Sequence, residues 1–211
     1  MENIQPNFFN NLGYLSSSLS DVDLMPIRKE IQEIIDRRFE LTEKSTTTLA
    51  GNIEKEYYLS QSKEYLDGLL WPFCEEYNSI FRYMRSINVL TQDVPLILDK
   101  VWVNFQEKNE FNPLHNHGGI YSFVIWIDIP YSIQDEMNHP STRDSNNQCA
   151  GHFTFTYINV LGDIQSVNIP ADMTYNNRIL FFPARMMHSV NPFRTSDGLR
   201  ISVSGNYKLK I

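Results

Sequence analysis

Two histidines stand two positions apart in the short run from Pro113 to Gly119. Alternate residues of a β-strand point to the same side, so we expect His115 and His117 to present both imidazoles on one face. Neutral imidazole binds iron, zinc, copper and nickel, and two ligands on one face can share a metal ion. The glycines that follow allow a sharp turn. The spacing predicts a metal site, and a purely structural His-x-His pair on a strand is the alternative.

A third histidine, His188, follows Phe182 and Pro183 at the start of another expected strand. In a jelly roll, strands that are distant in sequence lie side by side, so the separation from His117 is no obstacle to a shared site. Three protein ligands leave coordination positions open, as a catalytic metal requires. The three histidines are therefore the candidate metal ligands and catalytic centre.

An arginine lies within the alternating run from Leu199 to Ser204. If the apolar residues of this run pack on one face, Arg200 and Ser202 share the other. A buried guanidinium needs partners, and its two-pronged edge suits the carboxylate of a ligand, to which Ser202 could add a hydrogen bond. The alternative is a solvent-exposed face with Arg200 on the surface.

The elements that must position these residues change in character near residue 95. Helical spacing predicts helices over Met25–Glu43 and Ser60–Ile87, with Pro72 able to kink or split the second, and a connecting loop over Thr46–Tyr58. After residue 95, short alternating runs predict eight strands: Ile97–Phe105, Asn112–His117, Tyr121–Ile129, Gly151–Ile158, Ile164–Ile169, Arg178–Phe182, Met187–Asn191 and Leu199–Leu209.

This order predicts a mainly β protein with N-terminal α-helices and a double-stranded β-helix core, the cupin-like jelly roll. We assign residues 1–95 to a helical support region and residues 96–211 to the core of one compact domain. The polar stretch Ser132–Ala150 is expected to be a mobile loop rather than a lid. Within it, His139 is expected to be solvated, while His152 just beyond it is expected to be structural or to support the site.

Composition limits the classes of function. The 211 residues carry a formal net charge of -7, which argues against a broad nucleic-acid surface. Cys74 and Cys149 are isolated from each other and predict two free thiols. The N-terminus has no signal-peptide pattern, and the apolar stretches are too short to cross a bilayer. We therefore expect a soluble, cytoplasmic protein with no membrane partner.

Several pieces of sequence share an order and spacing with a known family: Trp102–Asn104, Phe111–His117, Ser122–Pro130, Phe182–Pro183, His188–Val190 and Arg200–Ser202, together with Leu49–Ile53 before the core. The run from Trp102 to Tyr207 resembles the iron(II)/2-oxoglutarate-dependent oxygenases, especially the small oxygenases encoded by phages of marine bacteria. The resemblance covers at least half of the chain.

The resemblance implies iron(II) at one open end of the jelly roll, with 2-oxoglutarate and O2 as co-substrates. His115 and His188 would be the proximal and distal ligands, Arg200 would pair with the far carboxylate of 2-oxoglutarate, and Ser202 would lie beside it. The implied reaction is the hydroxylation of a C–H bond in a peptidyl side chain or small molecule. The family usually has a carboxylate where this chain has His117, so the site would carry one less negative charge.

Alternatives remain open from the residues alone. Asp128 or Glu136 could supply the missing carboxylate, and Tyr121 or Trp126 could line the mouth of the pocket. A three-histidine, cupin-type dioxygenase or isomerase would not use 2-oxoglutarate, and a jelly-roll binding module would not be catalytic. An inward-facing arginine favours the oxoacid over the first rival. The N-terminal helices could either brace the sheet or form a homodimer.

Overall fold

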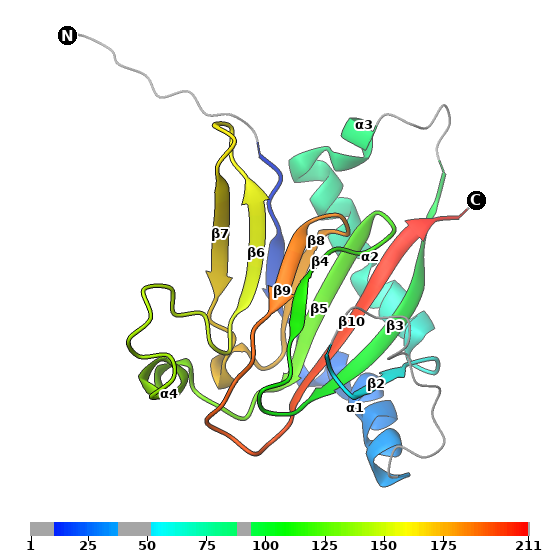
Figure 1. Ribbon diagram of the computed structural model, residues 1–211. Helices are drawn as coiled ribbons and strands as arrows, with labels where there is room; N and C mark the ends of the chain where they lie inside the picture. Colours follow the sequence, from blue (N-terminus) through cyan, green and yellow to red (C-terminus); the bar gives the residue numbers. More distant parts are fainter. Residues whose placement is uncertain (1–10, 38–51, 88–93, 211) are drawn as a thin grey trace, which may run out of the picture.

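The structure is a computed structural model that describes residues 11–37, 52–87 and 94–210. It contains two antiparallel sheets that face each other as in a jelly roll (Figure 1). The larger sheet has the order β1 (Leu15–Ser18), β8 (Arg178–Pro183), β5 (Tyr121–Asp128), β10 (Arg200–Leu209), β3 (Leu96–Gln106) and β2 (Lys55–Tyr58). The smaller sheet has the order β4 (Asn112–His115), β9 (Met187–Val190), β6 (Phe153–Ile158) and β7 (Ile164–Ile169).

Strands β1 and β2 were not expected, because both lie in the N-terminal region that was predicted to be a helical support. β1 pairs with β8, and β2, which falls in a segment predicted to be a loop, pairs with β3. The eight predicted strands are present with ends that differ by one or two residues. The predicted linker Leu49–Ile53 lies mostly outside the described residues.

The helices start and stop at different places from those predicted. Helix α1 (Asp21–Asp36) begins before Met25 because Ser20 and Asp23 form a capping box. The second predicted helix is two, α2 (Lys63–Phe81) and α3 (Tyr83–Ile87), separated at Arg82, which has a φ of 51°. Pro72 lies inside α2 without ending it. Residues 38–43 of the first predicted helix lie outside the described part of the chain.

Two apolar cores lie on the two faces of the larger sheet. The outer face packs against α1 and α2, as shown by the burial of Leu24, Tyr77 and Phe123 in one cluster. The inner face packs against the smaller sheet, where Trp126 and Phe153 are among the buried residues. Alternating strands therefore divide their side chains between a helix-covered core and the interior of the jelly roll.

The stretch Ser132–Ala150 is not wholly irregular, since α4 (Ile133–Asn138) begins at the Ser132 cap and is followed by turns. A 3-10 helix, η1 (Met173–Tyr175), joins β7 to β8. Cys74 and Cys149 are free thiols, as predicted. Within the described ranges, no helix is both long and apolar enough to span a membrane.

Candidate active site

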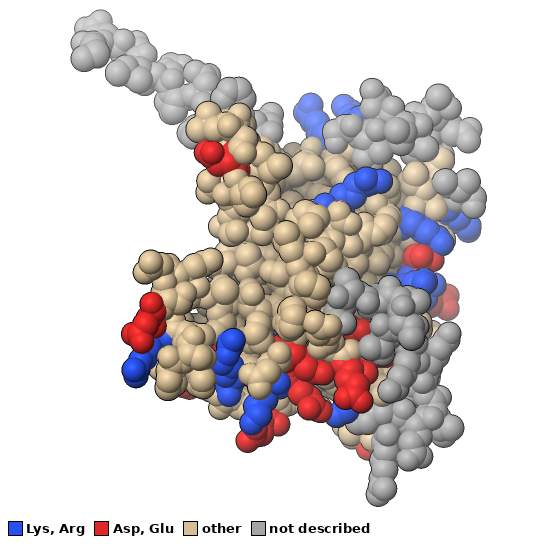
Figure 2. Space-filling model, viewed as in Figure 1, with Lys and Arg blue, Asp and Glu red and all other residues tan. Residues whose placement is uncertain are grey.

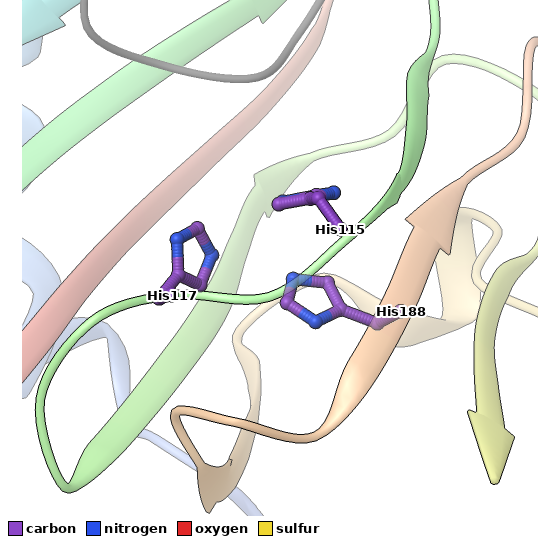
Figure 3. A group of neighbouring side chains, drawn as sticks. All are labelled: His115, His117 and His188. Carbon is purple, nitrogen blue, oxygen red and sulfur yellow. The ribbon is translucent and has the colours of Figure 1, made fainter.

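The three candidate histidines come together on the inner side of the smaller sheet (Figure 3). His115 ends β4, His117 lies in the loop that follows, and His188 lies opposite His115 in the β4–β9 register. One ligand atom from each residue lies within 4.8 Å of the others. Gly119, at a φ of 103°, then turns the chain toward β5. The three histidines therefore converge as expected, although His117 lies in the loop after β4 and not on the predicted strand.

Backbone carbonyls fix the orientation of two of these rings. Nδ1 of His115 lies 2.7 Å from the carbonyl oxygen of Pro113, and Nδ1 of His188 lies 2.9 Å from that of Met186. Each Nδ1–H can donate to its carbonyl, which leaves the Nε2 lone pair free. Metal-binding histidines are commonly oriented by such a second hydrogen bond.

All three imidazoles are held in the neutral form. Burial lowers the pKa of His115. Burial, with a smaller contribution from His115, lowers the pKa of His117 to about 4. Burial, followed by the two neighbouring histidines, lowers the pKa of His188 to about 3. Neutral imidazole is the form that binds a metal ion, so near neutral pH no proton must be removed first.

Aromatic rings pack against two of the three histidines. The indole of Trp102 lies 5.6 Å from the His117 ring, and Phe153 stacks on His188 at 5.3 Å. A cavity of about 460 Å³ opens beside His115 and His117. Its wall also includes Tyr58, Lys100 and Asn206. The candidate metal site therefore adjoins a space large enough for a small ligand or a substrate side chain.

Arg200 lies inside the jelly roll, as its exposure of only 2% shows. Nη1 donates to the Tyr131 hydroxyl at 2.6 Å and to the Gly151 carbonyl at 2.9 Å. Nε and Nη2 both donate to Oε1 of Gln106, and Nη2 also donates to the Asn191 carbonyl. These partners are all neutral, so within the described residues this cation is not bonded to a carboxylate.

Ser202 shares the inner face with Arg200, as the alternation predicts. Its hydroxyl accepts a hydrogen bond of 3.3 Å from the side-chain amide of Asn104, its register partner on β3. Glu56 lies opposite Asn104 on β2 and is fully buried. Neither of its carboxylate oxygens has a hydrogen-bond partner among the residues that the structure describes. A row of polar side chains therefore crosses three neighbouring strands of the larger sheet.

The two carboxylates considered as substitutes for a third histidine ligand lie outside this cluster. Asp128 is exposed at the end of β5 and accepts a bond from Asn176. Glu136 is buried, but its oxygens accept from the backbone amides of Arg194 and Thr195 and from the Thr195 hydroxyl. Glu136 therefore fixes α4 to the segment that leads into β10.

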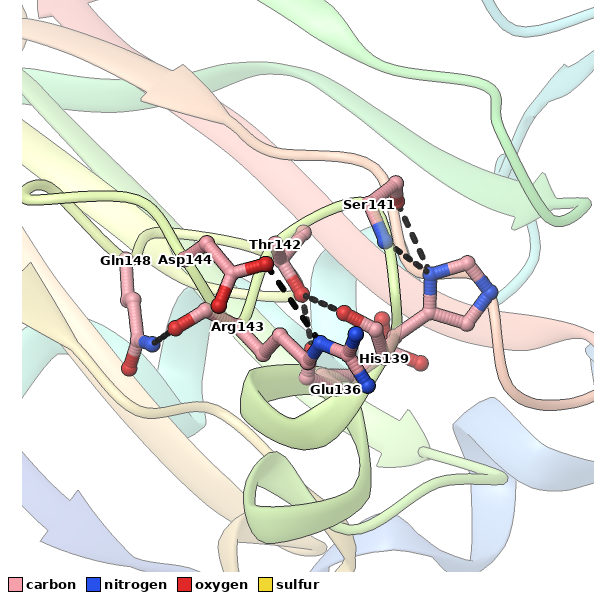
Figure 4. A network of polar contacts seen from close by, with 7 residues as sticks. All are labelled: Glu136, His139, Ser141, Thr142, Arg143, Asp144 and Gln148. Carbon is pink, nitrogen blue, oxygen red and sulfur yellow. Dashed lines mark hydrogen bonds and ion pairs between the residues drawn. The ribbon is translucent and has the colours of Figure 1, made fainter.

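The stretch around Glu136 is held by its own polar contacts (Figure 4). The hydroxyl of Thr142 donates to the Glu136 carbonyl, and Nδ1 of His139 lies 2.8 Å from the Ser141 hydroxyl. His139, which was expected to be solvated, is the C-cap of α4 and is partly buried. His152 is buried and its ring bonds to the Ala150 carbonyl, which agrees with a structural role.

The aromatic residues predicted to line the pocket are elsewhere. Tyr121 packs with Tyr77 and Phe181 in the helix-covered core, because it occupies the outer-facing position at the start of β5. Trp126 faces inward but is buried among its neighbours. Trp102 is the tryptophan that contacts a histidine of the cluster. Its position two residues before Asn104 on an alternating strand could have indicated that it faces the same side as Asn104.

Charged side chains gather along one rim of the face that carries β4, β9 and β6 (Figure 2). The centre of that face is mostly uncharged. The cavity beside His115 and His117 nevertheless has charged residues in its wall, namely Asp99, Lys100 and Lys208.

Comparison with known proteins agrees with this geometry. Residues 100–206, about half of the chain, match the family model of the 2OG-Fe(II) oxygenases. Among curated proteins, none matches the sequence.

Solved structures with a similar fold include three 2-oxoglutarate-dependent or prolyl-hydroxylating proteins. A viral collagen prolyl hydroxylase from Paramecium Bursaria Chlorella virus-1 has 12% identity and a TM-score of 0.51, over 92% of this chain and 94% of that one. A Pseudomonas putida prolyl-4-hydroxylase has 13% identity and a TM-score of 0.52, over 93% and 92%. The epimerase SnoN of nogalamycin biosynthesis has 16% identity and a TM-score of 0.51, over 92% and 77%. At these identities the similarity shows the fold alone.

Proposed function

Because the chain belongs to the 2OG-Fe(II) oxygenase family, we propose that it is a hydroxylase whose iron is held by His115, His117 and His188. In this proposal Arg200 binds the distal carboxylate of 2-oxoglutarate, with Ser202 nearby. The observation that carries the proposal is the convergence of three neutral imidazoles within 4.8 Å. The match to the family supports the chemistry, and the cluster supports the choice of residues.

The donor set suits iron(II). Imidazole nitrogen is a ligand of non-haem iron, and three such ligands leave positions for a chelating oxoacid and O2. Iron and 2-oxoglutarate together supply the oxidising chemistry when they are bound. The carbonyls of Pro113 and Met186 would hold two of the ligand rings in the binding orientation.

The surroundings of Arg200 suit a carboxylate. Nε and Nη2, the edge of the guanidinium that takes a carboxylate in two-pronged pairs, share the single oxygen Oε1 of Gln106. Trp102 packs on His117 and Phe153 packs on His188, so these rings would shield the two histidines from water on that side.

For the prime substrate, we infer a C–H bond of a peptidyl side chain or a small molecule. Proline within a peptide is the first candidate to assay, since two structural neighbours are named as prolyl hydroxylases. This rests on analogy of fold, and folds host many reactions.

The test is an anaerobic titration of the iron(II)-loaded protein with 2-oxoglutarate, followed by the visible charge-transfer band of the chelate. We expect a saturable band in the wild type that is lost or greatly weakened in His117→Ala and Arg200→Ala. The matched controls are His139→Ala and Arg143→Ala, which remove the same side-chain types from the Ser132–Ala150 stretch. Both controls should keep the wild-type band.

Other outcomes would replace the proposal. Bound iron with no band would favour the three-histidine dioxygenase or isomerase that does not use 2-oxoglutarate. That rival has one observation in its favour, since all five N–H groups of Arg200 already have protein acceptors. Failure to bind iron would favour a non-catalytic jelly-roll module.

A further inference from the structure

One edge of the Arg200 guanidinium is capped by a side-chain amide. Oε1 of Gln106 accepts from Nε at 2.9 Å and from Nη2 at 2.6 Å. Both residues are 2% exposed, and they face each other in the β3–β10 register. One neutral oxygen therefore occupies the place where a ligand carboxylate would make a bidentate pair.

The other contacts of Arg200 are less free to change. Nη2 also bonds to the Asn191 carbonyl, and Nη1 bonds to the Gly151 carbonyl, so both are fixed by the backbone. The Tyr131 hydroxyl, which accepts from Nη1, also donates to the Gly151 carbonyl at 2.8 Å. Gln106 is thus the partner that can leave by rotating its side chain.

The amide of Gln106 is itself held in place. Its Nε2 donates to the Glu110 carbonyl at 2.6 Å, which points Oε1 toward the arginine. A ligand that takes the Nε–Nη2 edge must break both bonds of Oε1. A carboxylate can do so because a charge-assisted pair is stronger than a bond to a neutral amide, whereas a neutral group gains nothing from the exchange.

We propose that Gln106 is an internal competitor for the carboxylate site on Arg200, and that it sets both the affinity for 2-oxoglutarate and the requirement for a distal carboxylate. This inference rests on the proposed function, because it takes Arg200 as the co-substrate anchor. It makes Gln106 a specificity-determining residue of the co-substrate site.

The competitor is removed in Gln106→Met, which keeps a similar volume but offers no oxygen. Two buried N–H groups of Arg200 then lack an acceptor in the ligand-free protein, and the co-substrate supplies one. Gln106→Glu has the opposite effect, since its carboxylate would pair permanently with Arg200. Gln165→Ala, an exposed position on β7, is the matched control.

The experiment is calorimetric titration of the manganese(II)-loaded protein with 2-oxoglutarate and with pyruvate, an oxoacid that lacks the distal carboxylate. We expect Gln106→Met to bind 2-oxoglutarate roughly tenfold more tightly and Gln106→Glu at least roughly tenfold more weakly. Pyruvate affinity should not change in either variant. Thermal melting of each variant checks that it is folded, and the Glu variant tests the proposal if the Met variant does not fold.

The outcomes separate the two proposals. If the wild type does not bind 2-oxoglutarate, or if Arg200→Ala binds it equally well, the assignment of Arg200 fails and this inference fails with it. If Arg200→Ala loses binding but Gln106→Met binds no more tightly, only the competitor role is overturned. Weaker binding in Gln106→Met would mean that the amide helps to hold the carboxylate. Unchanged binding in Gln106→Glu would likewise overturn the proposal.

Discussion

Glu56 should make the stability of this protein depend on pH in a direction unusual for a carboxylate. It lies on the edge strand β2, faces the interior and is fully buried. In the described part of the chain, neither carboxylate oxygen has a hydrogen-bond partner. Burial, with a smaller contribution from the like charge of Glu110, raises the pKa of Glu56 to about 7 from its ordinary value of 4.5. The folded protein therefore favours the neutral acid.

The size of the effect follows from this difference in pKa. Each pH unit corresponds to about 1.4 kcal/mol, so the whole difference is worth about 3 kcal/mol. Relaxation around the carboxylate reduces this, and we expect a change of about 2 kcal/mol. Because the folded pKa is the higher one, the stabilising contribution is fully present below pH 4.5 and is lost as the pH rises through about 7.

The assay is urea unfolding of the metal-free protein across this range, comparing the wild type with Glu56→Gln. Relative to the wild type, the unfolding free energy of Glu56→Gln should rise by about 2 kcal/mol between about pH 5 and about pH 8. Glu64→Gln, at an exposed position in the first turn of α2, removes the same charge and should show a constant difference. A constant difference for Glu56→Gln as well would refute the reasoning, since it would mean that the carboxylate is solvated or paired.

Three further substitutions test other parts of the structure. His188→Ala should lower iron(II) affinity by more than roughly 100-fold in a metal-competition titration, and an unchanged affinity would remove it from the ligand set. Glu136→Gln weakens the bonds to Thr195 and should cost about 2 kcal/mol in urea unfolding, with no loss if those bonds contribute little. Gly119→Ala should cost about 1–3 kcal/mol, because φ is 103° and a Cβ would lie 2.5 Å from the Tyr207 carbonyl oxygen; an unaltered melting temperature would contradict this.

The parts of the site that sequence could predict depend on local periodicity. Alternation along β10 places Arg200 and Ser202 on the inner face. The His-x-His spacing also predicted that His115 and His117 lie close together, although His117 lies in the loop after β4 and not on the strand. His188 could be added because a jelly roll pairs strands that are distant in sequence. For Arg200 and Ser202, a repeat of two residues is enough to say which side each residue faces.

What sequence could not predict depends on partners brought in from elsewhere. Glu56 lies in a segment without a visible strand pattern, and only pairing with β3 turns its side chain inward. Gln106 ends β3, and nothing near it in sequence indicates that it faces Arg200. Glu136 lies in a stretch whose polar composition predicts a solvated loop. Its carboxylate is instead buried and accepts hydrogen bonds from the backbone amides of Arg194 and Thr195. The break at Arg82 is a left-handed residue that helical spacing does not reveal.

The charges inside the jelly roll suggest why a third histidine is compatible with the proposed chemistry. The histidines are neutral, Arg200 is a cation surrounded by neutral acceptors, and Glu56 is uncharged below about pH 7. Iron(II) in this set would keep both of its positive charges, so iron and Arg200 together would exceed the charge of a 2-oxoglutarate dianion. A carboxylate in place of His117 would remove that excess. A neutral ligand at this position would therefore increase the electrostatic attraction for the co-substrate, and this added attraction would favour displacement of Gln106 from the buried arginine.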